Sequence, residues 1–362
     1  MDLIFIGQFV SQEEALTSLY YSQAANMYQK RFIKFIQPSL AISIIPLAVN
    51  KNIEFDYSDY PVNFINHSIS CKPNLISKIL RILRDTRTTI NLVCSAKSRD
   101  VWFYNITMST FLIAVYLRFF SNKRLFVLVA DYSFEKKLSS RMIRALINSV
   151  NGCIVWNSKI KHRNRVVLPD VLDSNAIRKN EICQLRRNVI FSGSLGQTTG
   201  FEVVLEYFSR HPDYHLVITG RPYNYSAEQF QELIDKFVTP CQNIVYLGLL
   251  PMEEYYRILD SVDIALSFRD PMDTQHDGNF PSKILEYLSF GKIVISTKHY
   301  CDIDPNIYFF TKPDELYIDR IFEEIFNLSE EEIGNKRKYI YNYLLENHTE
   351  TALLSAIIKV SK

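Results

Sequence analysis

A cation and a carboxylate lie close together in the run "DGNFPSKILEYLSFGKIVIST", residues 277–297, where a helix is expected to begin. Pro281 favours the first turn of a helix. The free backbone amides of that turn, together with Ser282 and Lys283, would attract a diphosphate. Glu286, about one turn further along, could accept hydrogen bonds from a ribose diol. A surface helix with ordinary solvated charges explains these residues equally well.

Two further segments could take part in binding an anion. The polar loop of residues 269–281 opens with Arg269, directly after an apolar run, and is long for a connection in an α/β protein. The run "FSGSLGQTTG", residues 191–200, is a glycine-rich turn between a strand and a helix. Such a turn could bring backbone amides to a phosphate, although a tight turn without any ligand explains it about as well.

Strand and helix patterns alternate over the first half of the chain, which predicts a parallel sheet covered on both faces. The expected strands are residues 3–7, 41–47, 100–105, 124–132, 152–158 and 165–171, and the expected helices are residues 15–36, 78–87, 106–119 and 135–150. The apolar run Ile106–Leu117 is too short to span a bilayer, so a buried core helix is expected there.

The alternation restarts after a polar linker at residues 172–187. Strands are expected at residues 188–193, 214–220, 243–248, 262–268 and 292–297, with helices at 201–209, 227–237, 252–259 and 281–290. The predicted fold class is therefore α/β, with two doubly wound Rossmann-like domains at residues 1–175 and 188–335. Residues 336–362 are predicted to form helices that return to the first domain.

Charge is distributed unevenly along the chain, although its net charge is only +2. Residues 72–187 hold 22 Lys and Arg against 7 Asp and Glu, whereas residues 188–362 hold 15 against 26. Such an excess of basic residues favours an anionic partner, although part of it can be a solvated helix surface. Nucleic acid is the less favoured partner, because no recognition helix or stacking motif accompanies the charge.

The six cysteines are isolated, with neither a CxxC pair nor a histidine at zinc-ligand spacing, so no metal site is predicted. They are expected to be reduced thiols in a cytosolic protein. The first residues, "MDLIFIGQFV", lack a basic leader and are expected to form a strand.

The ordered segments "VIFSGSLGQTTGFEVVLEYF", "NIVYLGLLPMEEYYRILDSVD" and "VDIALSFRDPMDTQHDGNFPSKILEYLSFGKIVIS" together resemble the donor half of GT-B glycosyltransferases. They are most similar to the family-four retaining enzymes of bacterial polysaccharide synthesis. Over residues 1–187 the resemblance is weaker and is carried by "SQAANMYQKRFIKFI", "RLFVLVADYS" and "GCIVWNS". The resemblance implies that two Rossmann-like domains face a central cleft.

The resemblance also implies a nucleotide-sugar site in the second domain. Glu286 would bind the ribose, Ser282 and Lys283 would hold the diphosphate at the helix start that Pro281 opens, and Arg269 would be a second phosphate ligand. The remaining donor-binding candidates are the turn of Gly193, Ser194 and Gly196 over the sugar phosphate, and the backbone of Leu249 and Leu250 beside the nucleobase.

The sequence departs from the family pattern at three positions. Gly278 lies eight residues before Glu286, where many members carry a first acid, and Ser194 and Thr199 replace a common Arg and Lys. Neutralisation of the donor phosphates would then fall to Arg269, Lys283 and Arg221. The alternative is a catalytically inactive GT-B partner or nucleotide-binding subunit of another glycosyltransferase.

The reaction that the resemblance implies needs neither a metal nor another cofactor, since cations that stabilise the departing diphosphate supply the main electrostatic help. Asn105 and Asp131, which end strands of the first domain, are predicted helpers, although Asp131 could equally cap a turn. The expected acceptor is a saccharide of a capsule, O-antigen or other cell-surface polysaccharide. It is expected to be linked to polyprenyl diphosphate and to be met at the inner membrane surface by the basic first domain. A sugar-nucleotide epimerase or a phosphorylase is less favoured.

Overall fold

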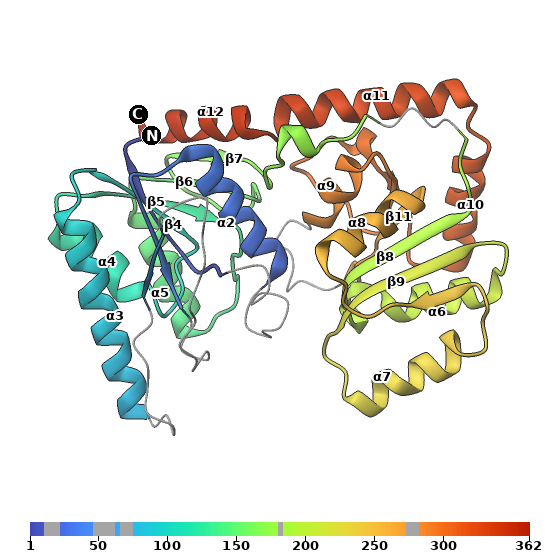
Figure 1. Cartoon of the computed structure of the whole chain (residues 1–362), viewed down its shortest axis with the longest axis horizontal. Helices are drawn as coiled ribbons and strands as arrows, with labels where there is room; N and C mark the ends of the chain where they lie inside the picture. The colour runs from blue at the N-terminus through green and yellow to red at the C-terminus, as the bar shows by residue number, and fades with distance from the viewer. Residues whose placement is uncertain (11–21, 46–61, 66–74, 180–183, 273–281) are drawn as a thin grey trace. The chain divides into compact units, whose positions relative to one another are not determined.

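The computed structural model describes residues 1–10, 22–45, 62–65, 75–179, 184–272 and 282–362. The contacts within the chain divide it into two compact units (Figure 1). Unit 1 holds the described residues of Met1–Val171 together with the C-terminal segment Glu350–Lys362. Unit 2 holds the described residues between Leu172 and Thr349. The chain therefore passes from unit 1 to unit 2 and ends in unit 1.

Unit 1 is built on a seven-stranded sheet in the order β3-β2-β1-β4-β5-β6-β7, and every neighbouring pair of strands is parallel. Its strands are β1 (Leu3–Gly7), β2 (Leu40–Ile44), β3 (Val62–Ile65), β4 (Asp100–Tyr104), β5 (Arg124–Val129), β6 (Gly152–Val155) and β7 (Arg165–Val167). The central strands are almost continuously apolar because both faces of the sheet are covered.

Helices cover both faces of this sheet (Figure 1). On one face, α3 (Leu75–Ser95), α4 (Phe111–Phe120) and α5 (Leu138–Ser149) lie side by side and share one apolar core with the strands. The other face packs α2 (Gln23–Ile36) through aromatic rings, with Phe5 stacked on Phe32 at 4.6 Å between ring centroids. The C-terminal helix α12 (Glu350–Ser361) lies against β6 and β7, as expected for a helix that returns to the first domain.

Unit 2 repeats the same topology with six parallel strands in the order β10-β9-β8-β11-β12-β13. The strands are β8 (Asn188–Leu195), β9 (His215–Pro222), β10 (Ile244–Tyr246), β11 (Ile264–Ser267), β12 (Ile293–Ser296) and β13 (Phe309–Phe310). In each sheet the first strand lies beside the fourth, which is the strand order of doubly wound nucleotide-binding folds. The predicted fold class is thereby confirmed.

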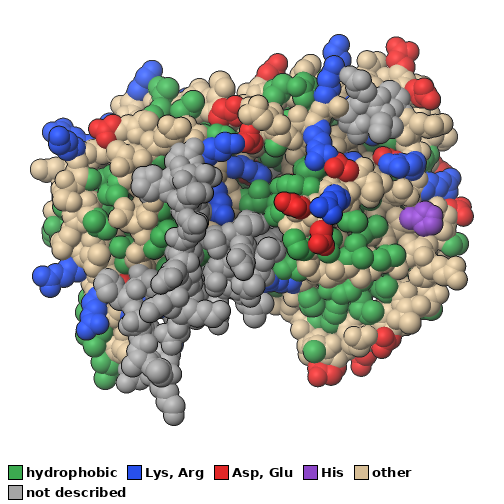
Figure 2. All heavy atoms as spheres, viewed as in Figure 1, with side chains coloured by type: hydrophobic (Ala, Val, Ile, Leu, Met, Phe, Trp, Pro, Cys, Tyr) green, Lys and Arg blue, Asp and Glu red, His purple; other side chains and the backbone are tan. Residues whose placement is uncertain are grey.

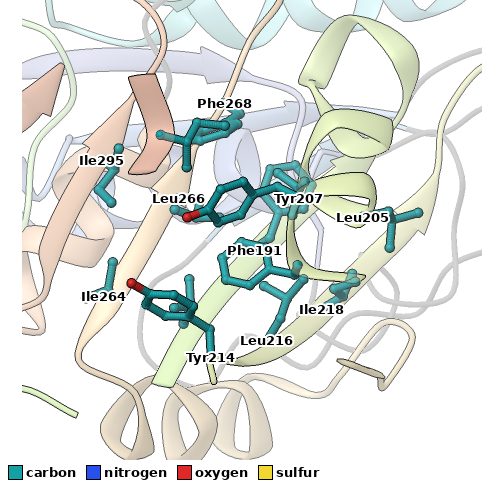
Figure 3. Packing of buried hydrophobic residues seen from close by; sticks show 14 of the residues in the cluster. Phe191, Leu205, Tyr207, Tyr214, Leu216, Ile218, Ile264, Leu266, Phe268 and Ile295 are labelled. Carbon is teal, nitrogen blue, oxygen red and sulfur yellow. The ribbon is translucent and has the colours of Figure 1, made fainter. Parts of the chain in front are cut away.

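A large apolar cluster joins the strands of unit 2 to its helices (Figure 3). Phe191, Leu216 and Ile264 contribute to it from three neighbouring strands, and Leu205 and Tyr207 contribute from α6. The helices of this unit are α6 (Phe201–Arg210), α7 (Ala227–Leu233) with a π-helical turn at Ile234–Val238, α8 (Met252–Ser261), α9 (Ser282–Ser289), α10 (Glu315–Phe326) and α11 (Glu330–Asn347). Among the described helices, none is both long and apolar enough to cross a membrane.

The prediction for the helix after β4 is wrong in two respects. The helix begins at Phe111 and not at Ile106, because Asn105 takes a left-handed conformation and a turn closes from Thr107 to Thr110, where the Thr107 amide donates to the Thr110 hydroxyl at 2.9 Å. It is also not fully buried, since Leu112 and Phe119 are exposed on its outer side. The first part of the expected helix 15–36 lies largely outside the described residues.

Candidate functional site

Lys283 and Glu286 lie one turn apart at the start of α9, which follows the loop after β11. The Lys283 Nζ donates to Glu286 Oε2 at 2.6 Å, and the two groups form an ion pair. Their side chains are 33% and 16% exposed, so both are partly withdrawn from water yet open to it. The resemblance implies that the two groups bind different parts of a ligand, whereas in the structure they bind each other.

Tyr255 on α8 joins this pair and is a site residue that the sequence pattern did not predict. Its hydroxyl accepts a hydrogen bond from Lys283 Nζ at 3.0 Å and donates to Glu286 Oε2 at 3.2 Å. The Lys283 ammonium also lies 4.3 Å from the centroid of the Tyr255 ring, which is close enough for a cation–π interaction. Tyr255 therefore fixes the position of both charged groups.

Two further residues extend the network to the central strand of the sheet. The Ser192 hydroxyl on β8 lies 3.1 Å from the Tyr255 hydroxyl and 2.8 Å from that of Tyr287 on α9. The Tyr287 hydroxyl also accepts from the Ser192 amide at 3.2 Å. We call Ser192, Tyr255, Lys283, Glu286 and Tyr287 the Lys283 network. It ties β8, α8 and α9 together near the carboxyl end of β8.

The protonation states of this network follow from its surroundings. Burial acts to lower the pKa of Lys283, but Glu286 and Tyr287 act to raise it, and the pKa is raised overall. Burial, together with the Glu286 carboxylate, raises the pKa of the Tyr255 hydroxyl well above its ordinary value. Near neutral pH the network therefore holds a lysine cation and neutral tyrosines, which leaves Lys283 able to bind an anion.

The glycine-rich turn after β8 lies beside Lys283. A Cβ at Gly193 would lie 4.0 Å from Lys283 Cε, so the structure brings these two predicted residues together. Gly193 pairs in register with Gly220 of β9, and their φ angles are +124° and +136°. A Cβ at Gly220 would overlap the Gly193 carbonyl oxygen, so the two backbones approach too closely for any side chain there.

The rest of the turn is closed by its own groups. The Thr199 hydroxyl accepts from the Gly196 amide at 2.9 Å and donates to the Gly196 carbonyl at 2.8 Å. Gly196 is buried, and a Cβ there would lie 2.6 Å from the Tyr223 carbonyl oxygen. Gly196 and Thr199 thus shape the turn. Ser194 is exposed and pairs in register with Arg221, which is partly exposed at the end of β9.

Arg269 lies close to the end of β11, the strand next to β8. Its backbone is held on both sides by Thr297, whose hydroxyl accepts from the Arg269 amide and donates to the Arg269 carbonyl, each at 2.7 Å. Its side chain acts on Tyr300: burial raises the pKa of the Tyr300 hydroxyl, and the Arg269 charge acts to lower it. Arg269 therefore belongs to the same edge of the sheet as the Lys283 network.

The remaining candidates of the second domain are placed as follows. Leu249 and Leu250 are partly exposed in the loop between β10 and α8, just after Gly248, whose carbonyl accepts from the Gly220 amide at 2.8 Å. Ser282 opens α9 and is also partly exposed. Pro281 and Gly278 lie outside the described residues.

In unit 1, Asn105 and Asp131 are brought together where β4 and β5 end. Asn105 has a φ of +50°, and its Nδ2 donates to Asp131 Oδ2 at 3.1 Å. Its Oδ1 accepts from the amides of Ala130 and Asp131 at 2.9 and 3.2 Å. Asp131 is exposed as a residue, yet partial desolvation by the protein raises the pKa of its carboxyl, and the Asn105 hydrogen bond opposes that rise.

Gln8 marks the end of β1, beside this pair, and was not predicted. Its Nε2 donates to the Ser109 hydroxyl at 2.6 Å and to the Thr107 hydroxyl at 3.3 Å. Its backbone is held by the buried Gln29 of α2, which accepts from the Gln8 amide at 2.8 Å and donates to its carbonyl at 3.0 Å. Polar groups therefore line the edge of the sheet between β1 and β4, where ligands of doubly wound folds bind.

The described residues contain no group of three or more His, Cys, Asp and Glu side chains that could hold a metal ion. The chemistry that the described groups offer is the binding of an anion by cations and amides in unit 2, and hydrogen bonding by an amide–carboxylate pair in unit 1.

Residues 174–303, whose described part lies in unit 2, match the family model described as glycosyl transferases group 1. No curated protein matches the chain in sequence. The match includes all five members of the Lys283 network, together with Arg269 and the glycine-rich turn.

Several solved structures have the same fold over the whole chain. Sucrose-phosphate synthase from Thermosynechococcus elongatus is similar with a TM-score of 0.73 and 11% identity, covering 100% of this chain and 98% of that one. Anabaena HepE in complex with UDP and glucose is similar with a TM-score of 0.70 and 11% identity, covering 100% and 99%. The lipopolysaccharide outer core galactosyltransferase WaaB is similar with a TM-score of 0.62 and 15% identity, covering 99% of both chains.

The fold is therefore GT-B, which confirms the fold that the resemblance implies. The family match in unit 2 and the fold of the whole chain together support glycosyl transfer.

Proposed function

We propose that the chain is a retaining glycosyltransferase that moves a sugar from a nucleotide-sugar donor to a saccharide acceptor. The observation that carries this proposal is the Lys283 network, which holds a cation and a carboxylate side by side at the start of α9. The network lies within the residues that match the glycosyltransferase model. Anabaena HepE, one of the similar structures, was solved in complex with UDP.

In the proposed donor complex, Lys283, Ser282 and the first amides of α9 bind the diphosphate. Glu286 accepts hydrogen bonds from the ribose diol, so the ligand takes over both partners of the present ion pair. Gly193 allows the backbone to come close to the sugar phosphate, since no side chain is interposed. Arg269 and Arg221 are the further cations that we assign to the diphosphate.

The proposed reaction breaks the bond between the anomeric carbon and the diphosphate oxygen. A new bond forms from that carbon to the acceptor oxygen on the same face of the sugar. The acceptor proton passes to the departing diphosphate, so the protein supplies no covalent nucleophile. Lys283 and the arginines stabilise the charge that develops on the leaving group, and we propose that neither a metal nor another cofactor takes part.

The acceptor side of the proposal rests on unit 1. Asn105 fixes the Asp131 carboxylate, which can accept a hydrogen bond from an acceptor or sugar hydroxyl. We propose that this acceptor is a saccharide linked to polyprenyl diphosphate, used for capsule, O-antigen or another cell-surface polysaccharide. The reaction would then take place on the cytoplasmic face of the inner membrane. The basic excess of residues 72–187 supports this choice because the acceptor is anionic.

A second candidate function is a GT-B partner without activity of its own. The observation that favours it lies in the glycine-rich turn, where Thr199 replaces a common cation and uses its hydroxyl within the turn. Such a protein would bind a nucleotide or another transferase without transferring sugar.

A thermal-shift screen against UDP-, GDP-, TDP- and ADP-sugars tests the proposal. A donor present at about 100 times its Kd should stabilise the protein by about 2.7 kcal/mol. Lys283→Ala and Glu286→Ala should lose that shift and the turnover of donor, whereas Lys312→Ala, which alters an exposed lysine elsewhere in unit 2, should keep both. Binding without turnover on any saccharide acceptor would favour the inactive partner. Normal binding and turnover in both site variants would contradict the site assignment.

A further inference from the structure

Thirteen of the 23 exposed large hydrophobic side chains among the described residues lie between Leu75 and Met142. This stretch contains α3, α4 and α5, which cover one face of the sheet in unit 1. Exposed apolar side chains scattered singly are normal on a protein surface, but a concentration on neighbouring elements marks an interaction surface.

The first half of α3 has its apolar side directed outward. Leu75, Ile76, Ile79, Leu80 and Leu83 are exposed and recur at helical spacing along one side of the helix. The opposite side, which packs against the protein, carries polar groups.

Arg81 and Asp85 are those buried polar groups. They form an ion pair at 3.4 Å, and Arg81 Nη2 also donates to the Ile45 carbonyl at 3.0 Å. A surface helix normally buries its apolar side and exposes its charges. The reversal leaves an apolar stripe on α3 that the described residues of unit 1 do not cover.

Helix α4 continues this surface. Its buried side is formed by Ile113 and Leu117, whereas Leu112, Tyr116 and Phe119 are exposed on the opposite side. In α5, Leu138 and Met142 are exposed one turn apart, and Phe134 is exposed in the segment just before the helix. Because the three helices lie side by side on the sheet, these side chains share its outer face.

The charges of this surface have one sign. The three helices carry seven Lys and Arg against a single acid, Asp85, which is buried and paired with Arg81. Lys78, Arg84 and Arg141 are exposed among the apolar side chains. In Figure 2, basic and hydrophobic side chains alternate along the outer edge of unit 1 at the left of the view. Apolar residues flanked by Lys and Arg form the pattern of helices that lie in the surface of an anionic membrane.

We infer that the outer face of α3, α4 and α5 docks onto an anionic lipid bilayer, with its apolar side chains entering the interface and its cations meeting the headgroups. We call it the α3–α5 face. It lies next to the edge of the sheet that holds Asn105 and Asp131, since the N-termini of these helices follow the carboxyl ends of the strands. The inference adds a docking surface to the proposed function. It can hold even where that function fails, because docking needs neither donor nor acceptor.

Sedimentation with lipid vesicles tests the inference without any assay of activity. The chain should bind vesicles of phosphatidylcholine containing about one third phosphatidylglycerol, and should bind pure phosphatidylcholine at least about tenfold more weakly. Because the apolar contact is not screened by salt, part of the binding should persist at about 1 M NaCl, where the Debye length is only ~3 Å. Absence of binding to anionic vesicles would overturn the inference.

Matched variants locate the surface. Ile76→Gln combined with Leu80→Gln should lower the partition to anionic vesicles by about tenfold or more. Each change removes an apolar side chain that would be buried in the lipid interface. Leu316→Gln combined with Ile358→Gln alters side chains of comparable exposure on α10 and α12 and should leave the partition unchanged. Equal loss in the two double variants would overturn the assignment to the α3–α5 face.

Two further measurements distinguish anionic lipid from the other possible occupants of this face. Lys78→Glu combined with Arg84→Glu should abolish the preference for anionic over neutral vesicles, and should do so with the Lys283 network intact.

The chain should be monomeric in solution by light scattering. A dimer that the Ile76→Gln and Leu80→Gln changes dissociate would mean that a second copy covers this face, and would overturn the lipid inference. Lys283→Ala should bind vesicles like the parent, so that failure of the proposed reaction and failure of docking are distinguishable.

Discussion

The two sheets share one strand order. The polar groups at their carboxyl ends differ in number and in how many hydrogen bonds link them. In unit 2, the Lys283 network places two charges and three hydroxyls within hydrogen-bonding distance of one another. In unit 1, Asn105 and Asp131 form a simpler amide–carboxylate pair, and Asp131 is exposed. Under the proposed function, unit 2 would hold one ligand through many groups, whereas unit 1 would offer hydrogen-bonding groups to a ligand that stays in contact with water.

The outer surfaces of the two units differ in exposed apolar side chains and in the sign of their charge. The helices α3, α4 and α5 of unit 1 expose apolar side chains and carry almost only basic charge. Residues 188–362, which make up most of unit 2, hold an excess of acids. The comparison teaches that one topology can carry different side chains at its strand ends and on its outer helix faces. We propose recognition of a ligand for the strand ends of unit 2 and docking for the outer helices of unit 1.

The positions of positive φ at the two carboxyl edges give the largest expected effect. Gly220→Ala should lower the free energy of unfolding by about 3 kcal/mol or more, because φ is +136° there and a Cβ would overlap the Gly193 carbonyl. The matched change in unit 1 is Asn105→Gly, which keeps the left-handed conformation and should cost only about 1 kcal/mol of hydrogen bonding. Denaturant unfolding measures both. Equal costs would show that the two edges are under the same constraint.

Asp131→Asn tests whether the two edges have separate tasks. The amide can keep the contact with Asn105, so the fold should hold while kcat falls about 100-fold, or about 2.7 kcal/mol in the barrier. Donor affinity, which we assign to unit 2, should change by less than about twofold. Steady-state kinetics and donor titration check this, with Asp213→Asn on an exposed acid of unit 2 as the control. A parallel loss of donor affinity would break the division between the units.

The buried cations of the two units give the next comparison. Arg81 in unit 1 has a carboxylate partner, Asp85, at 3.4 Å. Lys292 in unit 2 is buried and donates to the Val262 carbonyl at 2.7 Å. Burial lowers the pKa of Lys292 to about 8, although nearby Asp263 acts to raise it and Arg337 acts to lower it further. Protonated Lys292 therefore destabilises the folded protein, and the size of this loss depends on pH.

The sign of that dependence follows from the lowered pKa. Above pH 8 the unfolded chain holds more protons at Lys292 than the folded chain, so the contribution of Lys292 to stability should rise with pH. That contribution should reach about 2 kcal/mol by about pH 9.5, measured as the difference from Lys292→Met, because the tyrosines whose pKa is raised by folding lower the stability of both proteins over the same range. Lys292→Met should remove this rise, whereas Lys312→Met, on an exposed lysine, should keep it. Unfolding by denaturant at several pH values measures the slopes, and identical slopes in all three proteins would refute the assignment.

Tyr255→Phe should have the smallest effect. It removes the hydroxyl that touches Lys283, Glu286 and Ser192 but keeps the ring under the lysine. Because Tyr255 positions groups and is not expected to touch the donor, KM for donor should rise about fivefold, close to 1 kcal/mol, with kcat nearly unchanged. Tyr317→Phe, on an exposed tyrosine of α10, is the control. A fall in kcat with unchanged KM would assign Tyr255 to the chemical step.

The sequence predicted the sheets well because buried parallel strands are continuously apolar and stand out between helices. It missed β3, β13 and α10: the first is four residues long with a polar position, the second is two residues long, and α10 follows a loop without a clear signal. The sequence also did not predict that α3 exposes its apolar side. A periodic pattern shows that two sides of a helix differ, but it does not show which side is buried.

The candidate site was predicted only in part. Lys283 and Glu286 stand three residues apart, so their proximity could be read from the chain. Ser192 and Tyr255 come 91 and 28 residues before Lys283, and only the packing of β8 and α8 beside α9 brings them to it. The one available signal was a pair of tyrosines, Tyr255 and Tyr287, on the inner sides of two amphipathic helices, where a buried hydroxyl requires a partner.

The ion pair between Lys283 and Glu286 has a consequence for selectivity. A simple anion such as inorganic phosphate gains little at this lysine, because binding it draws the cation away from a carboxylate that then has only the Tyr255 hydroxyl among the contacts described above. A ligand that brings a diphosphate and a vicinal diol compensates both partners in one step. In the proposed donor complex, the pair would therefore weaken binding of each half of a nucleotide offered alone and favour the molecule that carries both.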